Sequence, residues 1–234
     1  MKLRILPAAL VLLGLVQSAS AVVIMVDVDS THNETGQPAN PIITQPGFTS
    51  YDAGSGAGGV TAERSMVVDG VTIDFFGGID GSRHRDETDV PSGGGGGGEY
   101  DALLRDFVFN DGNGAAVALR LTGLPLGVYD VTSWHWDSLP GTPGVTQVEV
   151  RNPGGAASRI ILADEVPFSQ DPIRYQITVD QEGEVLELVF RDDDAITTSG
   201  RSRLNGFIIE TVPEPTSAAV MGMGALALCL RRRR

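Results

Sequence analysis

The sequence predicts an all-β fold, an antiparallel β-sandwich or jelly roll, for the central part of this 234-residue chain. Short runs in which apolar and polar residues alternate recur along it, and turn residues separate them. Asp69-Gly70 between two apolar runs is typical of a hairpin turn. Because no helical pattern lies between the runs, an antiparallel sandwich is favoured over a parallel sheet with crossover helices.

Nine runs have the length and period of strands, and they cover residues 22–28, 66–78, 115–124, 128–136, 145–152, 159–163, 173–180, 185–191 and 203–210. In the run 185–191, Leu186, Leu188 and Phe190 share one face of the strand. Glu187 points to the opposite face. Only residues 100–107 are compatible with a helix, and it would be short.

Two stretches are expected to be flexible loops. Residues 29–65 are rich in Gly, Pro, Ser, Thr and Asn, and residues 92–98 contain six consecutive glycines. Ordering glycine costs more conformational entropy than ordering other residues, so these stretches are not expected to join the sheets. The sequence therefore predicts one β-sandwich domain over residues 22–211.

The N-terminus has the three parts of a secretory signal peptide over residues 1–21. Lys2 and Arg4 precede an apolar segment, residues 5–16, which is followed by small residues that include Ala19 and Ala21. The apolar segment is shorter than the ~20 residues that a spanning helix needs. We therefore expect signal peptidase to cleave after Ala21, so that the mature chain begins at Val22.

The C-terminal tail, residues 212–234, combines a short motif, an apolar segment and a basic cluster. The motif is Val212, Pro213, Glu214 and Pro215, and residues 216–230 follow without a charge. This segment is short for a bilayer whose hydrocarbon core is ~30 Å thick, and snorkelling arginine side chains reduce the mismatch. A short transmembrane helix is predicted, held with its end in the cytoplasm by Arg231, Arg232, Arg233 and Arg234.

The order of these three features resembles the PEP-CTERM sorting signal. That resemblance implies that an exosortase, a membrane transpeptidase, cuts near the Pro-Glu-Pro motif and releases or transfers the body. It also implies export in a Gram-negative bacterium that makes exopolysaccharide, transient anchoring in the inner membrane, and a final place on the cell surface or in a biofilm matrix. The alternative is a plain C-terminal anchor in which the motif is incidental.

The body is strongly acidic and lacks cysteine. The whole chain carries a formal net charge of −13, and residues 22–212 alone contain 11 basic and 29 acidic residues, a net charge of −18. Binding to nucleic acid or to anionic lipid is therefore disfavoured. Because the single cysteine, Cys229, lies in the tail, the body must be held by its core, with or without a bound metal.

Residues 100–137, together with 203–210, are similar to malectin-like and other galactose-binding-like jelly rolls. In those domains an apolar strand, a Gly-Leu-x-x-Gly turn and a Tyr-Asp-Val-Thr strand form a core hairpin. Here the three parts are residues 119–121, 123–127 and 129–132. The resemblance implies a jelly-roll fold, but other sandwich families use the same turn, so no function follows from it.

The two tryptophans are the candidate ligand-binding residues. A period of two places Trp134 and Trp136 on one strand face, and His135 on the other. If that face is exposed, the indole rings can stack on a sugar ring while Asp137 accepts a hydrogen bond from a hydroxyl group. The alternative is that both tryptophans lie in the core of the sandwich.

Acidic residues at strand ends are the candidate metal ligands. Their carboxylate oxygens suit a hard cation such as Ca²⁺ if the fold brings the side chains together. The alternative is a solvated acidic turn. The candidates are Asp27, Asp29, Asp192, Asp193 and Asp194.

No motif in the sequence assigns a catalytic residue. The three histidines show no metal-binding spacing, and the body has no nucleophile motif, while paired catalytic carboxylates leave no local signature. The leading hypothesis is a non-catalytic domain that associates with carbohydrate or extracellular matrix. An extracellular carbohydrate-active enzyme and a purely structural matrix protein stay open as alternatives.

Overall fold

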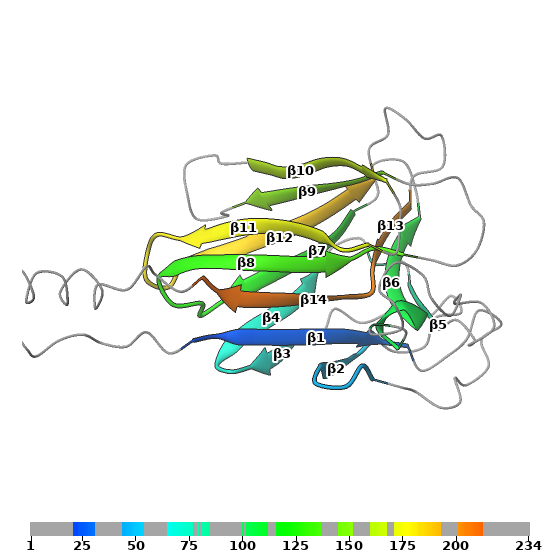
Figure 1. The fold of residues 1–234 in the computed structure, drawn as a ribbon, viewed down its shortest axis with the longest axis horizontal. Coiled ribbons are helices and arrows are strands. Elements are labelled where there is room, and N and C mark those ends of the chain that lie inside the picture. The colour runs from blue at the N-terminus through cyan, green and yellow to red at the C-terminus, as the bar shows by residue number, and fades with distance from the viewer. Residues whose placement is uncertain are drawn as a thin grey trace, which may run out of the picture.

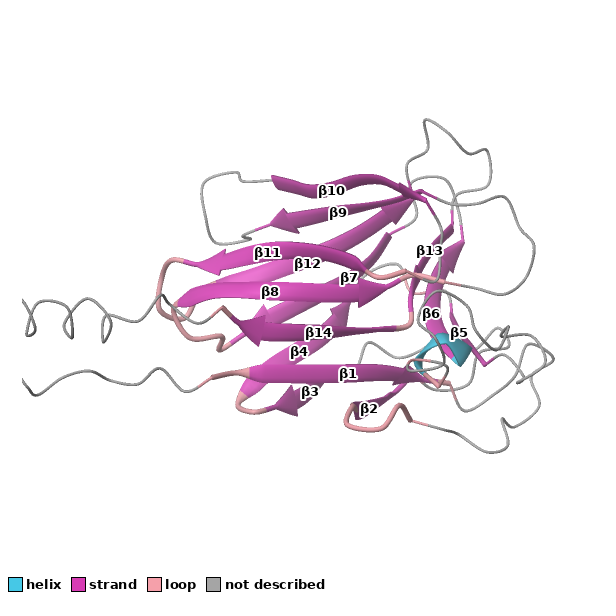
Figure 2. Cartoon of the chain, viewed as in Figure 1, coloured by secondary structure: helices cyan, strands magenta, loops and turns pink. Residues whose placement is uncertain are grey.

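The computed structural model describes residues 21–30, 44–53, 65–76, 79, 81–84, 100, 102–111, 116–136, 145–151, 160–167, 171–192 and 201–212. Within these ranges the chain forms fourteen strands and one 3-10 helix, η1 (Leu103–Arg105). The strands form two large sheets that pack face to face and a small third sheet (Figures 1 and 2). The predicted all-β sandwich is therefore confirmed.

The first sheet has five strands. Its order is β11 (Ile173–Val179), β8 (Gly127–Trp134), β14 (Gly206–Thr211), β1 (Val23–Asp29) and β2 (Thr49–Asp52). All pairs in it are antiparallel except β1 and β2, which run parallel. The predicted antiparallel pairing thus fails at this one edge.

The second sheet has six strands, all paired antiparallel. Its order is β10 (Ile160–Pro167), β9 (Val145–Arg151), β12 (Val185–Asp192), β7 (Ala116–Thr122), β4 (Val71–Phe76) and β3 (Ser65–Val68). A three-stranded sheet of β13 (Arg201–Leu204), β6 (Asp106–Asp111) and β5 (Gly81–His84) stands at one end of the sandwich (Figure 1).

The core lies between the two large sheets and follows the period of two. In β12, Leu186, Leu188 and Phe190 are buried in it, as the sequence predicts. In β11, buried and exposed residues alternate along the whole strand. Tyr51 of β2 stacks on Phe75 of β4 across the core, with ring centroids 3.8 Å apart. Burial of such side chains is the main stabilising term, about 1.5–3 kcal/mol each.

The Asp69-Gly70 turn is confirmed, and it joins β3 to β4. Both residues have a positive φ, 50° and 82°, as a type I′ hairpin turn requires. The Gly123–Gly127 turn differs from its predicted role. It connects β7 to β8, which lie in different sheets and do not pair, so the predicted core hairpin is wrong. The Tyr129 hydroxyl group donates to the Pro125 carbonyl at 2.7 Å and braces this crossover.

Three other elements differ from expectation. The predicted loop 29–65 contains β2, and the segment 100–107 forms only the short η1 before it continues as β6. The predicted strand 203–210 is broken at Asn205, so that β13 joins the small sheet and β14 joins the five-stranded sheet. The glycine-rich segment 92–98 lies outside the described residues.

The two ends of the described domain lie together. The Val22 amide donates to Thr211 Oγ1 at 2.7 Å, and the Thr211 amide donates to the Val22 carbonyl at 3.0 Å. The three-stranded sheet is at the opposite end (Figure 1). None of the described residues forms a helix with the length and apolarity needed to cross a membrane. Residues 1–20 of the predicted signal peptide, 1–21, and the predicted tail helix 216–230 lie outside the described part of the chain.

Candidate functional site

The outer face of the five-stranded sheet carries most of the candidate residues. In β1, every second residue from Ile24 onward belongs to the core, so Asp27 and Asp29 lie on the outer face. Asp27 pairs in register with Gly206 of β14, and Gly206 pairs with Trp134 of β8. Directly opposite residues share a face, so an acidic residue and an aromatic residue flank one glycine at the end near the three-stranded sheet.

Gly206 is what allows η1 to cover this end. A Cβ atom at residue 206 would lie 2.5 Å from Leu103 Cδ1 and 2.5 Å from the Val26 carbonyl oxygen. Leu103 is fully buried, and it packs with Leu104 and Trp134. Only glycine therefore permits this close approach of η1 to the sheet.

Trp134 lies in an aromatic cluster under that cover. Its ring centroid is 4.8 Å from that of Tyr100 and 6.4 Å from that of Phe48. Trp134 is 2% exposed, and Trp136, just beyond β8, is only partly buried. The two predicted stacking residues therefore differ: Trp134 is packed, and Trp136 keeps exposed surface. Asp137 lies outside the described residues.

An acidic cluster lies beside the aromatic cluster, at the end of β1. Asp27 and Asp29 are 0% and 1% exposed, and Asp106, the first residue of β6, is fully buried. The Gln45 amide donates to Asp27 Oδ2 at 2.5 Å, and the Thr44 hydroxyl group donates to Asp29 Oδ2 at 2.7 Å. The second oxygen of each, Asp27 Oδ1 and Asp29 Oδ1, is buried without a hydrogen bond.

Ionisation of Asp27 is costly. Burial raises the pKa of Asp27 to about 8, and the Asp29 and Asp106 carboxylates contribute to the increase. The hydrogen bond from the Gln45 amide acts in the opposite direction. At neutral pH Asp27 is therefore mostly protonated, and a bound cation would have to displace that proton.

The structure brings two of the five predicted metal ligands together. Asp192 ends β12 in the other large sheet, and Asp193 and Asp194 lie outside the described residues. The third acid beside Asp27 and Asp29 is Asp106, and not one of these three residues. As the side chains stand, no three His, Cys, Asp or Glu side chains within the described ranges are arranged to hold a metal ion.

A groove of about 370 Å³ lies further along the same sheet face. It is lined by residues of three adjacent strands: Asp130, Val131, Thr132, Arg174, Tyr175, Gln176 and Glu210. Gln176 Nε2 donates to Asp130 Oδ1 at 2.8 Å. The Arg174 side chain is exposed and makes no hydrogen bond or ion pair with another described residue. The groove thus presents donors and acceptors for a polar ligand.

The two carboxylates of the groove lie side by side. Asp130 and Glu210 are direct cross-strand partners of β8 and β14, so both rise from its floor. Glycoside hydrolysis needs carboxyl groups on either side of the scissile bond, ~5–10 Å apart.

His135 is buried, and both ring nitrogens are bonded within the fold. Its Nδ1 lies 2.6 Å from the Arg203 carbonyl oxygen, and its Nε2 lies 2.8 Å from Ser133 Oγ. Burial lowers the pKa of His135 to about 4, so the ring is neutral. A carbonyl can only accept, so Nδ1 carries the proton and Nε2 accepts from the serine.

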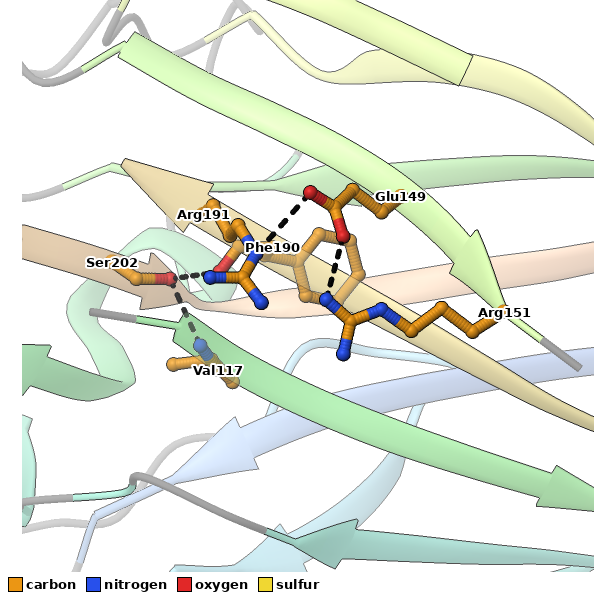
Figure 3. A network of polar contacts seen from close by, with 6 residues as sticks. All are labelled: Val117, Glu149, Arg151, Phe190, Arg191 and Ser202. Atoms are coloured by element: carbon orange, nitrogen blue, oxygen red, sulfur yellow. Dashed lines mark hydrogen bonds and ion pairs between the residues drawn. The ribbon is translucent and has the colours of Figure 1, made fainter. Parts of the chain in front are cut away.

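The outer face of the six-stranded sheet also has a buried acid, and it is paired. Glu149 of β9 is fully buried, and Arg151 Nη2 lies 2.8 Å from its Oε2. Arg191 Nε of β12 lies 3.2 Å from its Oε1 (Figure 3). Ser202 donates to the Phe190 carbonyl and accepts from the Val117 amide, which ties β13 to the two central strands of this sheet, β12 and β7.

The sorting residues lie mostly beyond the described domain. Ala21 is exposed just before β1, and Val212 ends the described part, while Ala19, Pro213–Pro215 and the four terminal arginines fall outside it. Residues 211–234 match the PEP-CTERM protein-sorting motif. The predicted resemblance of the tail is therefore confirmed. The motif implies an exported protein that is processed at the membrane by exosortase and reaches the cell surface.

Comparison with solved structures gives weaker likenesses. The ANXUR1 extracellular domain from Arabidopsis thaliana is 12% identical over 60% of this chain and 40% of that one, with a TM-score of 0.44. The CBM22-1 xylan-binding domain from Paenibacillus barcinonensis Xyn10C is 11% identical over 68% of this chain and 90% of that one, with a TM-score of 0.38.

A CBM35 domain from Cellvibrio japonicus Abf62 is 15% identical over 41% of this chain and 65% of that one, with a TM-score of 0.28. This chain spans less than half of the length of the Arabidopsis ectodomain chains that it matches. All of these TM-scores are below 0.5, so no ligand follows from them. No curated protein matches the chain.

Proposed function

We propose that this protein is an exported β-sandwich that exosortase sorts to the cell surface or exopolysaccharide matrix, where the domain binds carbohydrate without catalysing a reaction. The observation that carries the proposal is the sorting motif, whose match begins at Thr211, the last residue of the final strand of the sandwich. The tail is expected to be cut after the transmembrane helix has anchored the chain. The mature domain then remains outside the cell.

The groove over β8, β11 and β14 is the proposed carbohydrate site. Arg174 offers donors to adjacent sugar hydroxyl groups, and Gln176 and Thr132 offer both donors and acceptors. Asp130 and Glu210 accept hydrogen bonds but repel uronic acids, so neutral sugars are favoured. The ligand in this proposal is a neutral segment of the extracellular polysaccharide.

The binding test is retention of the secreted protein in gels that contain exopolysaccharide of the producing strain. Gln176→Ala and Arg174→Ala should each weaken retention severalfold, because they remove ligand hydrogen bonds. Gln181→Ala is the matched control, since Gln181 is exposed in the turn between β11 and β12, away from the groove. Equal retention of all variants, or no retention of the wild type, would exclude this site.

The acidic cluster supports a second, structural role for a hard cation. Asp27 Oδ1 and Asp29 Oδ1 are buried oxygens without hydrogen-bond donors, and Ca²⁺ prefers such ligands. With Asp106 nearby, the local charge suits a divalent cation, although the side chains would have to turn to gather around it. We propose that Ca²⁺ binds here and joins β1 to the segment 44–53.

Calorimetry of the secreted protein tests this cation site. Because Ca²⁺ binds only the folded state, a concentration about 100 times the Kd should stabilise the fold by about 2.7 kcal/mol. Asp29→Asn should abolish the increase in Tm, while Asp180→Asn, in the exposed turn after β11, should keep it. Identical melting curves in Ca²⁺ and EDTA would exclude a Ca²⁺ role.

A further inference from the structure

The sorting motif and the folded body share residues. The matched motif begins at Thr211, which is the last residue of β14. β14 is the central strand of the five-stranded sheet, between β8 and β1, so its end is hydrogen-bonded on both sides. The first two residues of the sorting motif are therefore part of the sandwich.

Four hydrogen bonds hold these two residues. The Thr211 hydroxyl group accepts from the Val22 amide at 2.7 Å and donates to the Val22 carbonyl at 3.2 Å. The Thr211 amide also donates to the Val22 carbonyl at 3.0 Å, and the Val212 amide donates to the Val128 carbonyl at 2.9 Å. We call the contacts between Val22 and Thr211 the terminal clamp.

The chain changes character directly after the clamp. Pro213 has no amide hydrogen, so it cannot donate a ladder hydrogen bond after Val212. Only five residues, 213–217, separate Val212 from the uninterrupted apolar stretch that begins at Ala218. Fully extended, they span at most ~18 Å. A processing enzyme therefore has to work between a folded sheet and the bilayer.

We propose that the terminal clamp limits access of the processing enzyme to the sorting motif, which rests on the proposed function that exosortase processes this chain. An enzyme that cuts a chain holds residues on both sides of the cut. Residues before Pro213 become available only when the end of β14 detaches from Val22 and Val128. The rate of processing then follows the small population in which this end is open.

The clamp also links the two ends of the chain. Val22 is the residue that the predicted signal cleavage leaves at the new N-terminus, and it is the partner that holds Thr211. A change at the N-terminal end of β1 should therefore alter processing at the C-terminal tail. Thr211 acts here as a positioning residue for the sorting motif.

The test uses the full chain in its own host, with the ratio of intact to processed protein measured by mass spectrometry after a pulse of synthesis. Thr211→Val keeps the shape and removes the hydroxyl hydrogen bonds, so the open population and the processing rate should rise about tenfold. Thr211→Ser keeps the hydroxyl group and should process at close to the wild-type rate. A second variant inserts Gly-Ser-Gly-Ser between Val212 and Pro213, which leaves the clamp intact but moves Pro213 and the rest of the motif away from it.

The insertion should also speed processing, even though it does not destabilise the body. Glu149→Gln weakens the body far from the clamp and should leave the rate unchanged, which separates local opening from general instability. If the wild type is processed and neither Thr211→Val nor the insertion is faster, the clamp proposal is wrong. If the wild type is never processed although exosortase is present, the proposed function itself fails.

Discussion

The outer faces of the two large sheets differ in whether their buried acidic residues are paired with arginine. On the six-stranded sheet, Glu149 is fully buried between two arginines, which neutralise it. On the five-stranded sheet, Asp27 and Asp29 are equally buried, and the groups that set the pKa of Asp27 are other acids and a backbone amide. Where a buried acid only links neighbouring strands, ion pairs with arginine are enough to compensate for its burial. Asp27 has no arginine partner among the described residues, so its ionisation costs stability, which is a common feature of functional sites.

The largest expected effect comes from replacing the uncompensated acid. The folded-state pKa of Asp27, about 8, lies above the ordinary value of 3.8, so the folded protein keeps a proton that the unfolded chain releases. Stability therefore falls as pH rises from 3.8 to about 8. In EDTA at about pH 7, Asp27→Asn should raise the free energy of unfolding by up to about 4 kcal/mol.

Chemical denaturation of the wild type and of Asp27→Asn, at several pH values, measures this. The advantage of the variant should be small near the ordinary pKa of 3.8 and should grow up to about pH 8. Asn keeps an oxygen that can accept from the Gln45 amide, so that contact is preserved. A variant that is less stable than the wild type at neutral pH in EDTA would contradict the assigned protonation state.

A smaller effect of opposite sign is expected at His135, which extends the comparison to a buried base. Its folded-state pKa, about 4, lies below the ordinary 6.5, so the unfolded chain binds a proton that the folded protein excludes. Stability is therefore lost as pH falls from 6.5 to about 4. Relative to His135→Asn, the wild type should lose up to about 3 kcal/mol over that range.

The same denaturation series measures how the free energy of unfolding changes with pH. The cavity left by His135→Asn lowers that free energy by the same amount at every pH, so it does not affect the slope. The slopes of Asp27 and His135 oppose each other between about pH 4 and pH 6.5. The summed contribution of the two residues to the free energy of unfolding should therefore be nearly constant over that range and should fall only above pH 6.5. Parallel pH profiles for the wild type and His135→Asn would show that the folded protein does not exclude the proton.

Replacing Glu149, the acid that is paired with two arginines, should have a smaller effect and should lower stability. Glu149→Gln leaves Arg151 and Arg191 without their carboxylate, which should lower the free energy of unfolding by about 1–3 kcal/mol. The smallest effect is expected from Glu187→Gln, at about 0–1 kcal/mol, because its side chain is 11% exposed and has the one ion-pair partner Arg120, whereas that of Glu149 is 0% exposed and pairs with two arginines. Urea denaturation at neutral pH ranks the two, and the reverse order would mean that the burial of Glu149 does not decide the strength of its ion pairs.

Sequence patterns were reliable where one strand face meets the core. The alternation in 185–191 predicts which side chains face the core between the sheets, and the Asp69-Gly70 turn predicts its own hairpin. They failed where a contact decides the structure. β2 lies in a stretch rich in turn residues and forms because β1 offers it an edge. The residues 203–210 give no sign that the strand is broken at Asn205. The side chain of Asn205 makes hydrogen bonds there to the backbone of Trp136, Asp106 and Leu104, which are distant in the sequence.

The candidate sites show the same division. Asp27 and Asp29 are visible as a pair because they are two residues apart in one strand, whereas Asp106 has no local signal and joins them only through the packing of β6. The groove residues come from β8, β11 and β14, which are distant in sequence. No spacing rule links Arg174 to Glu210, because a sheet brings them together by register.

The sequence by itself determined the sorting tail and the class of the fold, because an apolar segment, a basic cluster and a period of two are local properties of a chain. Only the tertiary structure decided which buried acids acquire partners, where the groove lies, and that the sorting motif starts inside the central strand. Those properties depend on contacts between distant segments, and sheet register and burial, which create them, exist only once the sandwich has closed.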